Sequence, residues 1–119
     1  MAKGATNRTG ARAEDAAAEV LRAAGLRLLF RNWRCRHGEI DLIADDRGTL
    51  VFAEVRMRRG AGFFGGARES ITAAKRARLC AAARLFLAGH GEADCRFDVL
   101  LIDAQSAGRV EWIRDAFGE

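Results

Sequence analysis

The sequence predicts an α/β protein with a mixed sheet of about five strands flanked by helices. Two observations carry this prediction. Helical and strand-like spacings of apolar residues follow one another in the order helix, three strands, helix, two strands. The chain also has 119 residues, half of them hydrophobic, which is enough for one domain with its own core.

The first predicted helix covers residues 11–24, where apolar side chains such as Ala13, Ala17 and Leu21 recur at helical spacing. Gly25 follows at the position where a left-handed residue commonly ends a helix. Residues 1–9 are small, polar and basic, so we expect a flexible N-terminal tail. Residues 10–119 then form a single domain.

Three strands are predicted after this helix. Leu26, Leu28 and Phe30 alternate with arginine, and residues 38–44 and 49–57 are two further strand-like runs. The polar sequence DDRG separates these last two runs, so they form the clearest hairpin in the chain.

Residues 60–68, GAGFFGGAR, are predicted to form a glycine-rich loop. A second helix follows from about Ser70, a plausible N-cap, to residue 88, with Gly89 as its stop. Residues 96–102 and 109–114 complete the sheet.

Composition excludes several classes of protein. No apolar run approaches the roughly 18 residues that span a bilayer, and the N-terminus has no apolar secretory segment. The three cysteines are widely spaced and form no CxxC pair, which argues against a disulfide framework and a structural zinc site. We therefore expect a cytoplasmic protein.

The net charge of +4 is unevenly distributed. Residues 56–84 carry eight basic residues and one acidic residue, whereas residues 85–119 carry three and seven. A basic segment of this kind favours an anionic partner, first of all nucleic acid. A bias toward arginine codons explains why the basic residues are mostly arginine and not lysine, but it does not explain why they cluster in residues 56–84.

Carboxylates lie at matching places on the predicted hairpin. Glu39 and Asp41 share one face of their strand, and Glu54 shares a face with Arg56 on the next. The turn between the strands allows Asp41 and Glu54 to meet, and a carboxylate pair of this kind holds Mg²⁺ for phosphodiester hydrolysis. The same alternation is also typical of any half-exposed hairpin, so the spacing alone leaves both interpretations open.

Three segments resemble the YraN family of uncharacterised bacterial proteins. They are residues 31–34 (RNWR), 38–44 (GEIDLIA) and 50–56 (LVFAEVR). Further matches are Gly10, Glu14, Asp15 and Ala17 near the N-terminus, Phe64-Gly65, Lys75, and Phe97-Asp98-Val99. The resemblance covers nearly all of residues 10–113.

That family resembles the restriction-endonuclease-like fold of PD-(D/E)xK nucleases, and most closely the archaeal Holliday-junction resolvases. The resemblance implies a nuclease-like domain with four catalytic positions, Glu14, Asp41, Glu54 and Arg56, and with Asp41 and Glu54 as ligands of Mg²⁺ or Mn²⁺. Arg56 departs from the family's usual lysine, and arginine cannot act as a general base. Glu14 is alternatively a first-turn acid favoured by the helix dipole.

Two functions follow, and a third is left open. The first is a divalent-metal-dependent endonuclease acting on structured or branched DNA, with DNA favoured over RNA. The second is a nucleic-acid-binding module that has lost turnover because of Arg56, and the third is a protein-interaction domain. Resolvases act as dimers, so the resemblance implies a homodimer, although no residue pattern identifies an interface. The predicted nucleic-acid-binding residues are Arg58, Arg59, Arg68, Lys75, Arg76 and Arg78.

Overall fold

The computed structural model describes residues 8–58, 71–103 and 106–118, with side chains from residue 12 onward apart from 58 and 106–108. Its elements, in chain order, are α2 (Arg8–Ala23), β1 (Arg27–Cys35), β2 (Gly38–Asp46), β3 (Thr49–Arg58), α4 (Ala73–His90), β4 (Cys95–Asp103) and β5 (Ser106–Phe117). Their order confirms the predicted succession of one helix, three strands, one helix and two strands.

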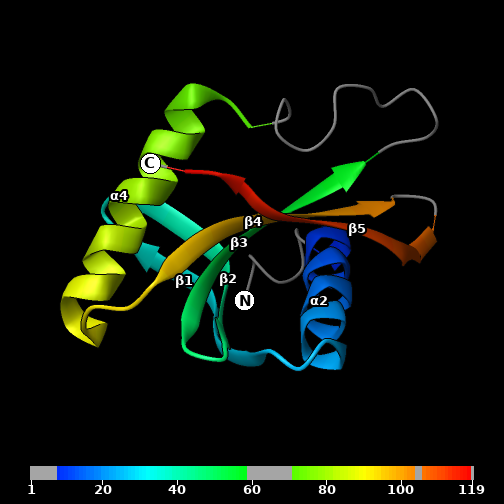
Figure 1. The fold of residues 1–119 in the computed structure, drawn as a ribbon. Coiled ribbons are helices and arrows are strands. Elements are labelled where there is room, and N and C mark those ends of the chain that lie inside the picture. The colour runs from blue at the N-terminus through cyan, green and yellow to red at the C-terminus, as the bar shows by residue number, and fades with distance from the viewer. Residues whose placement is uncertain (1–7, 59–70, 104–105, 119) are drawn as a thin grey trace.

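The strands form one mixed sheet in the order β1-β2-β3-β4-β5. Neighbouring strands are antiparallel except β3 and β4, which are parallel and joined through α4. Helices α2 and α4 lie on opposite flanks of the sheet (Figure 1). The predicted fold class, a five-stranded mixed sheet flanked by helices as in restriction endonucleases, is confirmed.

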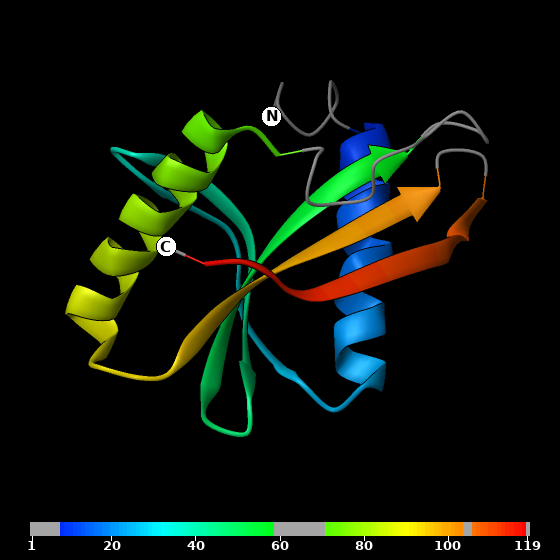
Figure 2. The same cartoon turned by 45° about the horizontal axis from the view of Figure 1, so that its top comes forward.

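Each helix packs on its own hydrophobic cluster. Small residues on α2, including Ala17 and Ala18, bring it close to the face of β3 and β4 that carries Val51 and Leu100. On the other flank, Phe86 of α4 packs beside Phe52 of β3. Turning the molecule shows β3, β4 and β5 fanning out in front of α2, with α4 to one side (Figure 2).

Local signals in the sequence explain most element boundaries. Gly25 ends α2 with φ +95°, and its N–H donates to the carbonyl of Arg22. Arg47 and Gly48 both have positive φ, 54° and 97°, and form the two-residue turn between β2 and β3. This geometry matches the right-handed twist of the flanking strands, and glycine adopts it without strain.

Both predicted boundaries of the second helix are wrong by about two residues. Its N-cap is Thr72, whose Oγ1 accepts a hydrogen bond from the Lys75 N–H at 3.1 Å, and not Ser70. The helix continues through Gly89 and ends at Gly91, which has φ +108°. A glycine ends a helix where a left-handed residue is needed, whereas the exposed glycine two residues earlier remains helical.

Two other predictions concern segments that lie partly or wholly outside the described residues, the N-terminal tail and the glycine-rich loop. Helix α2 begins at Arg8, inside the segment 1–9 that was expected to be a tail, and residues 1–7 lie outside the described part. The predicted glycine-rich loop at residues 60–68 also lies outside the described residues.

Candidate metal and phosphate site

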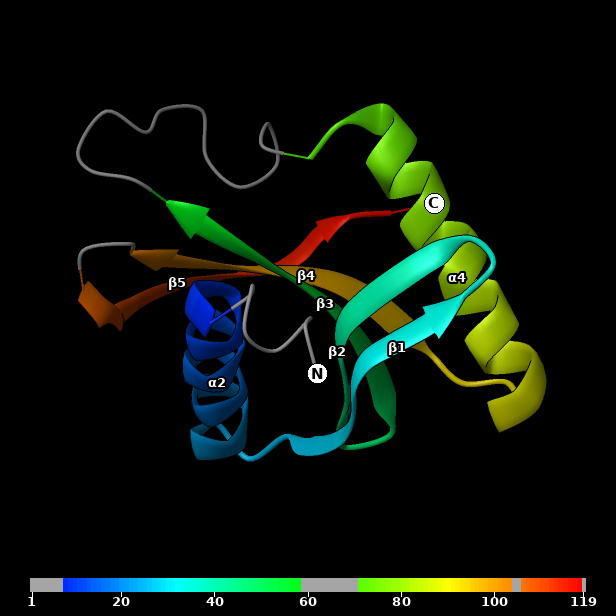
Figure 3. The same cartoon turned by 180° about the vertical axis from the view of Figure 1, so that it is seen from behind.

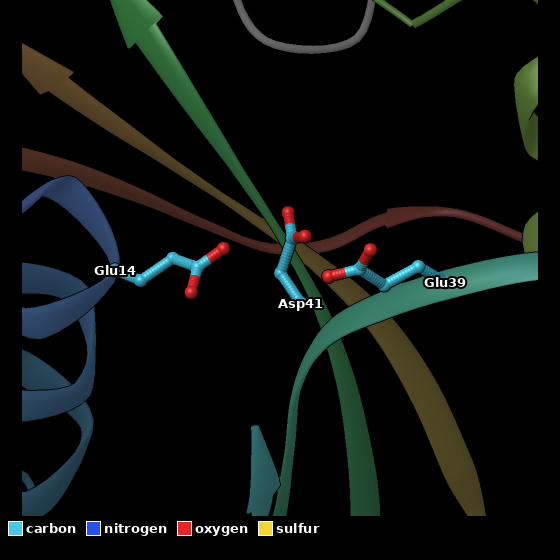
Figure 4. Close-up of side chains that lie close together, drawn as sticks. All are labelled: Glu14, Glu39 and Asp41. Carbon is cyan, nitrogen blue, oxygen red and sulfur yellow. The ribbon is translucent and has the colours of Figure 1, made fainter. Parts of the chain in front are cut away.

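Three carboxylates from two elements converge at the start of β2. Glu14 comes from α2, and Glu39 and Asp41 come from β2. One oxygen of each lies within 4.8 Å of the others. The close-up shows the Asp41 side chain between those of Glu14 and Glu39 (Figure 4). We call these three residues the acid cluster.

The acid cluster lies where the sheet divides. The β2–β3 ladder ends at the Leu42–Ala53 pair, while the β1–β2 ladder continues to Cys35 and Gly38. Seen from behind, the β1–β2 hairpin turns away from the end of β3 toward α4 (Figure 3). Beyond the division, the Val55 N–H donates to Oδ2 of Asp41 at 2.8 Å. The Asp41 side chain thus replaces a partner strand for this backbone group.

The surroundings of Asp41 disfavour its charge. Burial is the main cause that raises its pKa from 3.8 to about 7, and repulsion from Glu54 is the next. The hydrogen bond from Val55 acts in the opposite direction, and Glu14 and Glu39 add further repulsion. These surroundings therefore favour the protonated form of Asp41 more than water does.

Glu54 on β3 is almost completely buried and meets two cations. Its side chain is 5% exposed, and its Oε2 lies 3.4 Å from Nζ of Lys75 and 3.8 Å from Nη1 of Arg56. Its Oε1 is buried and has no hydrogen-bond partner within the described part of the chain. A buried carboxylate oxygen without a donor is costly, and a cation is one species that satisfies it.

The structure brings most of the predicted site residues together. The Leu42–Ala53 pair places Asp41 opposite Glu54, and Arg56 and Lys75 lie beside Glu54. Val51 and Val55, on the opposite face of β3 from Glu54 and Arg56, pack in the α2-side core.

The composition of the carboxylate group differs from the expected metal pair of Asp41 and Glu54. Glu39 joins Glu14 and Asp41 in the acid cluster, and Glu54 is not one of its three members. Glu39 was not among the predicted site residues. The signal was its position two residues before Asp41, on the same face of the strand.

The predicted nucleic-acid-binding residues divide into three groups. Lys75 and Arg78 line a cavity of about 150 Å³ together with His37, Gly38, Glu39, Asp41 and Leu79. Arg76 lines a different cavity, beside Cys80, Arg84 and Phe117. The side chain of Arg58, and Arg59 and Arg68 altogether, lie outside the described residues.

None of the helices in the described ranges is both long enough and apolar enough to cross a membrane.

Comparison with known proteins places the chain among close relatives. The model of the uncharacterised protein family UPF0102 matches residues 13–102. A UPF0102 protein of Ralstonia nicotianae is 57% identical over 115 residues, covering 92% of this chain and 86% of the relative. Relatives from Nitrosomonas europaea and Nitrosococcus oceani are each 53% identical, covering 92% and 97% of this chain and 93% and 96% of their own lengths.

Proposed function

Since the chain belongs to the uncharacterised protein family UPF0102, and since its site joins clustered carboxylates to cations, we propose that it is a divalent-metal-dependent nuclease. The family membership confirms the resemblance to YraN proteins found in the sequence. The observation that carries the proposal is the acid cluster at the division of the sheet, with Lys75 and Arg78 across the same cavity.

The residues present fit Mg²⁺ or Mn²⁺. Both ions prefer oxygen ligands and bind proteins through a small number of carboxylates. Glu14, Glu39 and Asp41 supply such oxygens, and Glu54 supplies a buried one that has no hydrogen-bond partner among the described residues. A bound ion of this kind lowers the pKa of a coordinated water and neutralises charge that develops on a phosphate.

The basic side chains near the acid cluster are placed to bind the phosphate group of a nucleic acid. Lys75 and Arg78 approach the cavity from α4, and Arg56 approaches Glu54 along β3. A protonated amine or guanidinium there binds a phosphate oxygen and stabilises the charge of the transition state. Arg56 stays protonated, so it binds and orients but does not remove a proton. The family resemblance expects a lysine at position 56, and Lys75 of α4 supplies an amine beside Glu54 in its place.

The substrate that we propose is structured or branched DNA, with the chain acting as a homodimer. The resemblance to Holliday-junction resolvases supports this choice, as does the basic composition of residues 56–84.

The test is cleavage of labelled four-way junction, flap and duplex DNA, with RNA of matched sequence, in Mn²⁺ or Mg²⁺. We expect cleavage of at least one DNA by the wild-type protein and a loss of at least about 100-fold in Asp41→Asn. Glu19→Gln is the control, because it also replaces a carboxylate by an amide, but at a side chain that lies outside the acid cluster and is 74% exposed. No cleavage by the wild type, or equal cleavage by Asp41→Asn, refutes the proposal. Cleavage confined to RNA refutes the substrate.

Arg56 favours a second candidate, a nucleic-acid-binding module without turnover. Its guanidinium lies 3.8 Å from Glu54, at the position where the related nucleases carry lysine. This candidate predicts salt-dependent binding without cleavage, in which each phosphate contact adds about 0.9 to the salt slope on duplex DNA. Cleavage that appears only in Arg56→Lys would decide for it.

A further inference from the structure

Asn32 has an unusual backbone conformation in the middle of an edge strand. It lies on β1 with φ +53°, a left-handed value that asparagine tolerates better than most residues. The flanking pairs Arg31–Leu42 and Trp33–Ile40 place it directly opposite Asp41 on β2. The irregular residue is therefore the β1 neighbour of the central carboxylate of the acid cluster.

The Asn32 side chain contacts another member of that cluster. Its Nδ2 donates to Oε1 of Glu14 at 3.0 Å. The preceding residue, Arg31, directs its guanidinium mainly to Asp15, at 2.8 Å, and lies 3.7 Å from the same Glu14 oxygen. Two consecutive residues of β1 thus hold the acidic pair Glu14-Asp15 of α2.

Glu14 needs such a restraint more than the other two carboxylates do. Glu39 and Asp41 are fixed relative to each other by one strand, whereas Glu14 reaches the acid cluster from a helix. A glutamate side chain has three rotatable bonds, and repulsion from two neighbouring carboxylates favours rotamers that turn it away. A neutral amide donor holds one Glu14 oxygen without adding a positive charge, and the carboxylate retains free acceptor positions for a cation.

We propose that Asn32 is a positioning residue, which fixes the Glu14 carboxylate in the acid cluster and so completes the metal site. This inference rests on the proposed function, because it assigns Asn32 a role at the same site. Outer-shell partners of metal ligands usually contribute 10- to 100-fold to metal affinity. Asn32 is exposed and water competes for Glu14, so we expect the lower end of that range, roughly 10-fold.

The experiment measures Mn²⁺ binding by isothermal titration calorimetry. Asn32→Gly removes the amide and keeps a residue that adopts positive φ without strain. Arg47→Gly makes the same kind of change at another left-handed position, φ 54°, in the turn between β2 and β3. We expect Asn32→Gly to bind Mn²⁺ about 10-fold more weakly than the wild type. Arg47→Gly is expected to bind as the wild type does.

A double-mutant cycle separates positioning from a general structural effect. If Asn32 acts through Glu14, adding Asn32→Gly to Glu14→Ala, which has no side-chain acceptor, weakens Mn²⁺ binding no further. A second readout needs no metal: the chain has only two asparagines, so the side-chain NH₂ resonances of Asn32 are readily assigned. These resonances are expected to shift in Glu14→Ala and to remain in place in Glu19→Gln.

The outcomes distinguish the two proposals. Wild-type protein that binds no Mn²⁺ overturns the proposed function and this inference together. Wild-type protein that binds Mn²⁺ while Asn32→Gly binds equally well overturns the inference alone. Additive losses in the double variant, or Asn32 resonances that do not respond to Glu14→Ala, also overturn it.

Discussion

Two aspartates in the sheet, Asp41 and Asp98, occupy very different surroundings. Asp98 on β4 is completely buried and accepts hydrogen bonds from Nε of Arg96, Nε1 of Trp112 and the N–H of Asp115, all at about 3 Å. Asp41 on β2 is only partly buried and accepts one hydrogen bond, from Val55, among the interactions that the described residues show.

Their electrostatic neighbours differ in the same way. Burial disfavours the charged form of Arg96, but hydrogen bonds to Asp98 and Asp46 outweigh it and raise the pKa of that guanidinium. The neighbours of Asp41 are instead carboxylates, which add to the effect of burial and raise its pKa. Burial of an acid is therefore not in itself a sign of function. The informative feature is whether the fold supplies donors and a countercharge, and around Asp41 it supplies too few.

The largest expected effect is on stability at Asp98. Asp98→Asn removes the charge that compensates Arg96 and turns an amide toward the donors of Trp112 and Asp115. We expect a loss of about 3–5 kcal/mol in the free energy of unfolding, measured by urea denaturation. Asp94→Asn is the control, because Asp94 is exposed just before the same strand. A loss under about 1 kcal/mol would place Asp98 in the same category as Asp41.

Asp41→Asn is expected to increase the free energy of unfolding, whereas Asp98→Asn is expected to decrease it. The pKa of Asp41 is about 7 in the folded protein, against 3.8 for an aspartate in an unstructured peptide, so the folded state binds the extra proton between these values. This acid therefore makes the wild type less stable as the pH rises from about 4 to 7, and the asparagine variant lacks that loss. We expect the variant to be more stable by about 2–4 kcal/mol at pH 8 and similar to the wild type below pH 4. Urea denaturation across this range checks the sign, and a destabilised variant at pH 8 would contradict it.

Divalent ions are expected to stabilise the folded protein through Asp41 and not through Asp98. Mn²⁺ at 100 times its dissociation constant stabilises a protein by about 2.7 kcal/mol if it binds only the folded state. We expect this stabilisation, seen as a rise in Tm, to be larger at pH 8 than at pH 6, because protons compete for Asp41 at the lower pH. Chelation with EDTA removes it. Asp98 variants that still fold retain the rise, and Asp41→Asn does not. An equal rise in Asp41→Asn would place the ion elsewhere.

The sequence was sufficient for the fold because each element carries a local signal. Helical spacing marks α2, alternation marks β3, and the turn at Arg47 and Gly48 joins two obvious strands. Element ends were less certain because adjacent residues compete for the same role. Gly89 and Gly91 both qualify as helix stops, and only the path of the chain selects Gly91.

Only the part of the site that lies on the β2–β3 hairpin could be predicted from the sequence, because there the pleating of the strands places the side chains. Pleating puts Asp41, Glu54 and Arg56 in register once the hairpin is recognised, and the same rule contained the signal for Glu39. Two features depended on packing between elements that are distant in the sequence. One is the approach of Lys75 to Glu54, and the other is the contact of Asn32 with Glu14. Nor does the sequence reveal that β2 is separated from β3 on the N-terminal side of Leu42, which is what leaves Asp41 with so few donors.

The smallest expected effect on stability is at Glu14, and it tests the comparison most directly. Glu14→Gln keeps an acceptor for Asn32 and removes one of the weaker sources of repulsion on Asp41, so we expect the free energy of unfolding to change by at most about 0.5 kcal/mol. The pKa of Asp41, followed by NMR, is expected to fall, and to fall further in Glu54→Gln, because Glu54 is the stronger repulsive neighbour. Mn²⁺ affinity is expected to fall in Glu14→Gln although stability hardly changes. Replacing a residue that serves only the fold is expected to lower stability and leave Mn²⁺ affinity unchanged, as we expect for Asp98. Glu14→Gln with a large loss of stability and unchanged Mn²⁺ affinity would therefore assign the acid cluster to structure.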